Sequence, residues 1–427
     1  MNHRFSQLLL SVAAVTCLGL SACGGGSSVE GTSATGTTQS DTGNGGSSPP
    51  AGAGSTSSSS SSSSSGGASS ASAGSSSAAA LAAKLGLPSR LLLGLGAQAN
   101  AGTASQAMSQ NLTVDIDEHY LVGVGSGDWT TWLPNGAFID QAANEAQSLH
   151  AVPMFTLYGM AANGDGNLSG LSNSTFMTAY WANARLLFQK LGALNRPSLV
   201  NFEPDFWGYA EQHSTNGDPT TVFAYVNGNS ECAGLSNNVI GVAGCLIAMA
   251  RKYAPQAYVG FPPSDWGGTN QNAVIAYMNK LGTQHADFIT MQTLDRDAGC
   301  FEANAAASSC AVAHQQTWYL DETNTTTPNY AQAMDNAQGY HDGIGGLPLI
   351  WWQTPMGVPS STPGGTANHY RDNHVHYFLT HASELTAVGS LAVVFGTGND
   401  FQTSIATDGG QFQSLSSAYL ASPAVLP

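Results

Sequence analysis

The sequence predicts an α/β protein folded as a single (β/α)8 barrel. Three observations support this prediction: short apolar, strand-like runs recur along the chain, helical patterns separate most of them, and no Gly-rich phosphate loop follows an early run. The predicted strands are residues 91–96, 120–124, 152–158, 199–203, 258–261, 288–292, 349–353 and 391–395. A doubly wound open sheet is the alternative fold, and the missing phosphate loop makes it the weaker one.

A further run at 317–320 leaves the strand count open. We interpret it as part of a long loop after the sixth strand, with the seventh strand as its alternative assignment. The helices between the strands are predicted from apolar residues at helical spacing. Residues 175–194 show this spacing strongly, and the other predicted helices are 138–149, 272–281 and 330–342.

The N-terminus resembles a bacterial lipoprotein signal. A polar start with His3 and Arg4 precedes an apolar stretch at 8–20, which is too short to span a membrane as a mature helix. The stretch ends in Leu20-Ser21-Ala22-Cys23, followed by Gly24. The resemblance implies that residues 1–22 are removed, that Cys23 is lipidated and that the protein is anchored in the outer membrane. An ordinary secretory signal is the alternative.

Residues 23–85 are predicted to form a disordered tether. The stretch is rich in Gly, Ser, Ala and Thr and contains an unbroken Ser run from Ser57 to Ser65, so it has little apolar surface to bury. As a flexible coil it would reach roughly 40 Å. We therefore expect one catalytic barrel domain at 86–427, held at the cell surface or released by cleavage of the tether.

The composition excludes several classes of protein. Only 11 Lys and Arg stand against 27 Asp and Glu, so the net charge is −16. Nucleic-acid binding and polybasic membrane binding both need clusters of cations, and this chain is too poor in them for either. Charged residues make up only 9% of the chain, which is common in secreted proteins that handle neutral polymers. We expect a monomer that binds a polysaccharide and needs no organic cofactor.

Cysteine usage fits export. Of the six Cys, four lie in the predicted domain, and proximity favours the pairs Cys232–Cys245 and Cys300–Cys310 among the three possible pairings. No CxxC spacing is present, so a zinc site is disfavoured. We predict no metal site.

Acidic and aromatic residues follow many of the predicted strands. In a (β/α)8 barrel the active face lies at these carboxyl ends. Alternation along the fourth strand places Leu199, Asn201 and Glu203 on the inner side, so Glu203 is expected to project into the barrel mouth. Partial burial there would raise its pKa toward that of a general acid. Candidate substrate-binding residues at the same face are Trp129, Tyr158, Asp205, Trp207, Trp266, Trp352 and Gln353.

The motif Asn201-Phe202-Glu203-Pro204 resembles the end of the fourth strand in TIM-barrel glycoside hydrolases. In that superfamily a Glu, often followed by Pro, is the acid/base. The resemblance implies the same role for Glu203, although the large retaining clan has Asn directly before the Glu, where this chain has Phe202. That clan also ends its seventh strand in a nucleophilic Glu, where this chain has Gln353. No single family is indicated.

Glycosidic cleavage needs a second carboxylate. The candidates are Asp205, Asp295, Asp297, Asp321 and Glu322. Asp295 and Asp297 follow the sixth strand, and an ion pair with Arg296 is their structural alternative. Asp321 and Glu322 lie on a long loop, where a surface turn or helix cap is the alternative. A separation from Glu203 of roughly 6.5–9.5 Å predicts inversion, and one of about 5–5.5 Å predicts retention.

The sequence therefore predicts a surface-anchored or secreted glycoside hydrolase that cleaves a polysaccharide. Glu203 is the predicted proton donor, and Asp295, Asp297 or Asp321 supplies the second carboxylate. The alternative is a non-catalytic carbohydrate-binding or adhesion lipoprotein on a degenerate barrel, and Gln353 is the observation that favours it.

Overall fold

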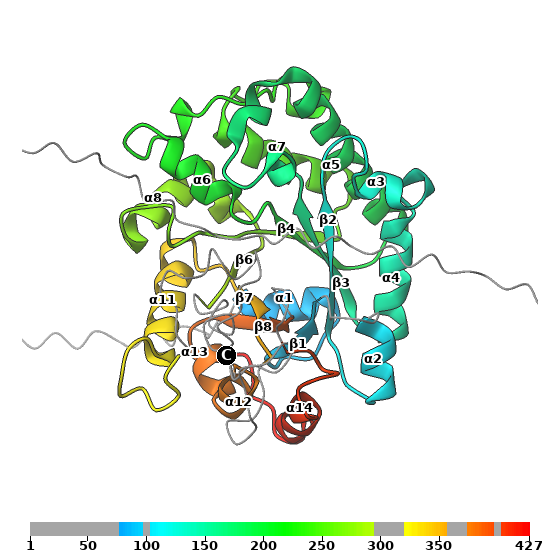
Figure 1. Ribbon diagram of the computed structural model, residues 1–427, viewed down its shortest axis with the longest axis vertical. Helices are drawn as coiled ribbons and strands as arrows, with labels where there is room; N and C mark the ends of the chain where they lie inside the picture. Colours follow the sequence, from blue (N-terminus) through cyan, green and yellow to red (C-terminus); the bar gives the residue numbers. More distant parts are fainter. Residues whose placement is uncertain (1–76, 97–102, 294–319, 357–373, 397–402) are drawn as a thin grey trace, which may run out of the picture. The chain divides into compact units, whose positions relative to one another are not determined.

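The computed structural model describes residues 77–96, 103–293, 320–356, 374–396 and 403–427. Eight parallel strands form one closed barrel in chain order, and β8 pairs with β1 to close it (Figure 1). The prediction of a (β/α)8 barrel is confirmed, and the alternative of an open sheet is wrong. The strands are β1 (Leu92–Leu95), β2 (Ile116–Val122), β3 (Val152–Tyr158), β4 (Ser198–Phe202), β5 (Ala257–Phe261), β6 (Phe288–Met291), β7 (Leu349–Thr354) and β8 (Ser390–Phe395).

The predicted and observed strands agree closely except at β2. This strand begins at Ile116, whereas the predicted run begins at Tyr120. The seventh strand is the run at 349–354, so it is not the run at 317–320. Of that run only Leu320 belongs to the described residues, and it lies in no strand.

Helices alternate with the strands and surround the barrel (Figure 1). The four predicted helices are confirmed as α4 (Phe138–Ser148), α5 (Ser174–Leu194), α8 (Gln271–Leu281) and α11 (Tyr330–Gly343). The others are α1 (Ser77–Leu85), α2 (Thr103–Ser109), α3 (Trp129–Trp132), α6 (Phe206–His213), α7 (Val239–Tyr253), α12 (His374–Thr380), α13 (Ala382–Ala387) and α14 (Gln411–Ala421). In the described part of the chain, no helix has both the length and the apolarity to cross a membrane.

Strand alternation divides the apolar core into two layers. Val200 and Phe202 belong to the outer layer, between the strands and the helices. Leu199 belongs to the inner layer, which fills the barrel. Many inner residues are the first or second of their strands, such as Leu92, Ile116 and Phe288, so this layer lies toward the amino ends of the strands. The carboxyl ends are left to polar side chains.

Helix α1 closes the amino end of the barrel. Its residues Ala78, Leu81, Ala82 and Leu85 belong to the same buried cluster as the inner strand residues. The predicted tether of residues 23–85 is therefore too long at its carboxyl end, because residues 77–85 form a packed helix. The Ala-rich sequence of this helix was read as an extension of the low-complexity stretch before it.

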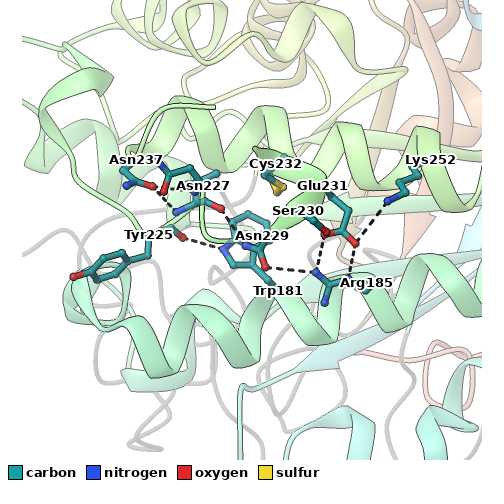
Figure 2. The surroundings of a disulfide bond; sticks show 12 residues. Trp181, Arg185, Tyr225, Asn227, Asn229, Ser230, Glu231, Cys232, Asn237 and Lys252 are labelled. Carbon is teal, nitrogen blue, oxygen red and sulfur yellow. Dashed lines mark hydrogen bonds and ion pairs between the residues drawn. A yellow bond between two sulfur atoms is a disulfide. The ribbon is translucent and has the colours of Figure 1, made fainter. Parts of the chain in front are cut away.

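One disulfide joins Cys232 to Cys245, which confirms the first predicted pair. It connects the short helix η5 (Ser230–Cys232) to α7, and Figure 2 shows its surroundings. Cys23, Cys300 and Cys310 lie outside the described residues. Within the described ranges, no group of three or more His, Cys, Asp or Glu is placed to hold a metal ion.

Candidate active site

A pocket opens at the carboxyl ends of β4, β5, β6 and β7. Its lining includes the acidic residues Asp205 and Asp265 and the aromatic residues Trp266, Tyr340 and Trp352. The volume is about 40 Å³, which is room for a few waters. This first pocket lies at the face where (β/α)8 enzymes carry their active sites.

A second pocket adjoins the first, because Pro204 and Asp205 line both. Its other walls come from the end of β3 and the loop after it, including Tyr158, Asp165 and Asn167, and from Tyr209 on α6. The Tyr158 hydroxyl donates a hydrogen bond of 2.6 Å to Asp165. Burial, together with the nearby Asp205 and Asp165 carboxylates, raises the pKa of Tyr158 well above its usual range. Tyr158 is therefore a neutral hydrogen-bond donor at physiological pH.

Asp265 is a site residue that the sequence analysis missed. The loop after β5 carries it into the first pocket, where the side chains of Asn336 and Tyr340 on α11 donate hydrogen bonds to its carboxylate. Burial raises its pKa despite these two donors. An acid directly before Trp266 at a strand end is the signal that the sequence offers.

Asp205 lies where the two pockets meet. It is the N-cap residue of α6, and its φ of 65° falls in the left-handed region that residues other than Gly seldom adopt. Asp165, Asp205 and Asp265 thus bring one carboxylate each from the ends of β3, β4 and β5 to these pockets.

The Glu203 side chain does not project into the barrel mouth, so that expectation is wrong. Its φ of 51° turns it out of the alternation of β4, and the side chain is 0% exposed. The carboxylate accepts backbone N–H bonds from Gly159 at 3.1 Å and from Met160 at 2.8 Å. The Tyr180 hydroxyl on α5 interacts with the same carboxyl, although its geometry falls short of a regular hydrogen bond.

Burial raises the pKa of Glu203 to about 7, and the bonds from Met160 and Gly159 limit the rise. The value suits a general acid, but Glu203 lines neither pocket, whereas its neighbours Pro204 and Asp205 line both. In this position the carboxyl fastens the loop after β3 to the end of β4. A positive φ at a Glu leaves no signal in the sequence.

A polar layer fills the barrel just below the first pocket. Glu118 on β2 accepts hydrogen bonds from Thr156 at 2.7 Å and from the Trp352 indole at 3.1 Å. Farther round, Thr290 donates to Asn201. Burial raises the pKa of Glu118. A side chain at Gly96 would bring its Cβ within 2.7 Å of Glu118, so this carboxyl needs a glycine beside it.

The aromatic candidates divide into two groups. Trp266 lines the first pocket and packs against the Tyr209 ring at 4.6 Å, and Trp352 forms part of the pocket wall. The expectation for the other two is wrong, because Trp129 is 0% exposed and Trp207 is 1% exposed. Both belong to the outer core layer, where the Trp207 indole donates to the Phe202 carbonyl. Aromatic residues at strand ends serve here as core as often as they face the site.

The Gln353 side chain is part of a chain of hydrogen bonds with Gln292 and Tyr120. Its side chain accepts a hydrogen bond from Gln292 at 2.6 Å and donates to the Tyr120 hydroxyl. With a φ of 50°, Gln353 is the third residue in the left-handed region at the carboxyl ends of the strands, after Glu203 and Asp205. Backbone strain of this kind costs about 1–3 kcal/mol per residue and gathers at functional sites.

Of the predicted second carboxylates, Asp205 lines both pockets and Asp321 lines neither. Asp321 holds a turn of its own, because it accepts hydrogen bonds from the backbone or hydroxyl groups of Thr323, Thr325 and Thr326. These bonds hold the pKa of Asp321 well below its usual range. This is the turn that its structural alternative predicted. Asp295 and Asp297 lie outside the described residues.

No protein-family model matches the chain, and no curated protein matches it. Solved structures similar to it include a xyloglucan-specific β-1,4-glucanase from a ruminal metagenomic library, at 12% identity and a TM-score of 0.47, covering 76% of this chain and 87% of that one. An endo-β-1,4-mannanase from Cellulomonas fimi is similar at 10% identity and a TM-score of 0.44, covering 80% of this chain and 74% of that one. A D-allulose 3-epimerase from Methylomonas sp. is similar at 11% identity and a TM-score of 0.38, covering 78% of this chain and 97% of that one. Glycoside hydrolases and a sugar epimerase both appear among these structures at TM-scores below 0.5. The likeness therefore concerns the fold and does not identify the reaction.

Proposed function

We propose that the protein hydrolyses a polysaccharide in the first pocket, with Asp265 as proton donor and Asp205 as the second carboxylate. The observation that carries this proposal is that two acidic residues, Asp205 and Asp265, line one pocket together with Trp266 and Trp352. Glycosidic cleavage requires two such carboxyl groups. Aromatic rings beside them suit the apolar faces of pyranose rings.

The proposed roles follow from the surroundings of each acid. Burial raises the pKa of Asp265, which favours the protonated form that a donor needs. In the reaction its proton passes to the glycosidic oxygen, the bond to the anomeric carbon breaks, and water supplies the new hydroxyl. Asp205 either activates that water or attacks the anomeric carbon itself, according to the separation of the two carboxyl groups.

Glu203, the donor predicted from the sequence, takes a positioning role in this proposal. Its bonds to Gly159 and Met160 fix the loop that forms a wall of the second pocket. They also fix the turn that carries Pro204 and Asp205. Removing this carboxyl should therefore disturb the site through its shape and not through loss of the transferred proton.

The proposal includes export and anchoring. The segment before Cys23 and the low charge of the chain favour a surface location facing neutral polymers, and the Cys232–Cys245 disulfide suits an oxidising compartment. Replacing Cys23 by Ser should then abolish palmitate incorporation in cells. Unchanged incorporation would refute the anchor and leave the hydrolase proposal standing.

The test is reducing-sugar release by the full chain from glucans, xylans, mannans and chitin. Asp265→Asn and Asp205→Asn should each lower kcat by about 100-fold or more, because each removes a reacting carboxyl. Asp140→Asn is the matched control, since Asp140 forms a surface ion pair with Lys190 on the outer helices. The alkaline limb of the wild-type pH profile should lie above the ordinary range for Asp, because activity is lost as the donor ionises.

Two other outcomes would overturn the assignment. If Asp265→Asn stays active, Asp265 is not the donor; if Glu203→Gln then binds the polymer as the wild type does but is inactive, Glu203 is the donor, as the sequence predicts. If the wild type binds a polymer but releases sugar from none, the alternative of a non-catalytic carbohydrate-binding protein is favoured.

A further inference from the structure

Residues 221–227, here called the rim segment, expose their larger side chains and bury their smaller ones. Val222, Ala224 and Val226 are inward, at 7%, 0% and 1% exposure. Phe223 and Tyr225 point outward, at 46% and 41%. Apolar residues on an extended surface segment ordinarily turn toward the core. Two aromatic rings at alternate positions that both face outward are unusual and mark a candidate binding surface.

The two rings lie against each other. Their centroids are 4.9 Å apart and their planes meet at 85°. Large exposed apolar side chains are few among the described residues: Met108, Trp132, Phe223, Tyr225 and Val425. Phe223 and Tyr225 are the pair in that set with a ring contact between them. Asn227 continues the outward row with an exposed amide, and none of these three side chains carries a charge at neutral pH.

The backbone of the rim segment is held firmly from several sides. Asn237 accepts hydrogen bonds from the backbone of Val226 and Asn227 through one side-chain oxygen. The Trp181 indole donates to the Tyr225 carbonyl at 2.9 Å, while the Tyr225 ring points away from Trp181 (Figure 2). A rigid support lowers the entropy lost when a ligand binds to the exposed rings.

The loop that follows the rim segment is fixed as well. Glu231 accepts two hydrogen bonds of 2.8 Å from Arg185 on α5, and the next residue, Cys232, is joined to Cys245 on α7 (Figure 2). Burial of the small side chains and these cross-links together make the outward rings a fixed surface.

The rim segment is linked to the wall of the second pocket. The Tyr225 amide donates at 3.0 Å to the carbonyl of Leu171 in η3 (Leu168–Ser172). Leu168, at the start of the same short helix, lines the second pocket. The backbone of the rim segment is thus bonded to the short helix whose first residue lines the second pocket.

We propose that Phe223 and Tyr225 form a second carbohydrate-binding site, which holds a polysaccharide strand outside the pockets. The C–H face of a pyranose stacks on an aromatic ring, and the Asn227 amide supplies hydrogen bonds to sugar hydroxyls. These three uncharged side chains suit a neutral polymer, and the hydrogen bond to η3 ties the rim segment to an element that lines the second pocket. The identity of the ligand rests on the proposed function, but binding at the rim does not depend on hydrolysis.

The experiment is affinity electrophoresis of the full chain in gels that contain hydroxyethylcellulose, glucomannan, xylan or glycol chitin. Phe223→Ala with Tyr225→Ala should weaken binding to at least one polymer by about fivefold or more, which corresponds to the loss of one strong contact. Tyr225→Phe, which keeps the ring, should bind nearly as well as the wild type. Trp132→Ala is the matched control, since Trp132 is exposed to a similar extent at 42%.

A second readout separates this proposal from the proposed function. Repeating the measurement with Asp265→Asn prevents cleavage of the polymer, and hydrolysis of short oligosaccharides by the rim variants should stay unchanged. A retained wild-type affinity in the double rim variant would overturn the second site, as would equal weakening by Trp132→Ala or failure of the wild type to bind any of the four polymers. None of these results bears on whether Asp265 and Asp205 cleave a glycosidic bond.

Discussion

At the scale of single residues, the buried Glu203 makes the stability of the barrel depend on pH. Its pKa rises from 4.5 to about 7 on folding because burial disfavours the charged form. The native carboxyl therefore contributes stability that is fully present below about pH 4.5 and is lost as the pH rises through 7. At about 1.4 kcal/mol per pKa unit, the effect amounts to about 3 kcal/mol.

Glu203→Gln should flatten this dependence. Gln offers one acceptor oxygen where Glu203 offers two to the Gly159 and Met160 amides, so the variant should lose about 1–3 kcal/mol at low pH. It should then lose less than the wild type between pH 5 and pH 8. Thermal unfolding across that range measures the slope, with Asp140→Asn as control. An unchanged slope in Glu203→Gln would show that the carboxyl ionises freely in the native state.

The same residues show where sequence reasoning fails at this scale. Strand alternation placed Glu203 inside the barrel, and the positive φ that redirects it cannot be read from residue types. Trp129 and Trp207 follow strands as Trp266 does, yet both are buried beneath helices. Residue type and strand end select candidates, but the direction of each side chain depends on the tertiary structure.

At the scale of elements, β2 explains the other main omission. The remaining strands are mostly apolar, as buried parallel strands usually are, and isolated polar residues such as Asn201 and Thr290 do not break their runs, so the sequence located them well. In β2, Asp117, Glu118 and His119 interrupt the run, so the predicted strand began at Tyr120. Glu118 was thereby left out, although it lies inside the barrel below Trp352. A polar layer inside a barrel hides its strands from an apolar search.

Glu118 should stabilise the interior mainly as a hydrogen-bond acceptor. Glu118→Leu leaves the Trp352 indole and the Thr156 hydroxyl without this partner, which should cost about 2 kcal/mol or more. Glu118→Gln keeps an acceptor oxygen and should cost less than about 1 kcal/mol. Urea unfolding at pH 7 gives both values. Equal losses in the two variants would mean that the acceptor oxygen kept by Gln does not set the contribution of Glu118.

At the scale of the whole molecule, the two ends of the barrel have different tasks. The amino end is apolar and is covered by α1, whose Leu81 and Leu85 are each 4% exposed. The carboxyl end carries the pockets with Asp205 and Asp265. The apolar packing that stabilises the barrel therefore lies at one end and the pockets lie at the other, which is the division expected for this architecture. The chain enters the barrel unit at its covered end, through α1.

The domain accordingly includes residues 77–85, although the sequence places its start at 86. A chain truncated to 77–427 should unfold at the same temperature as the full chain. One truncated to 86–427 should unfold well below it and bind a hydrophobic dye, because the inner layer loses its cover. Leu81→Ala in the full chain should cost about 2–4 kcal/mol, whereas Ala83→Gln, at an exposed position of the same helix, should cost little. If 86–427 is as stable as 77–427, α1 is an accessory to the barrel and the shorter boundary is right.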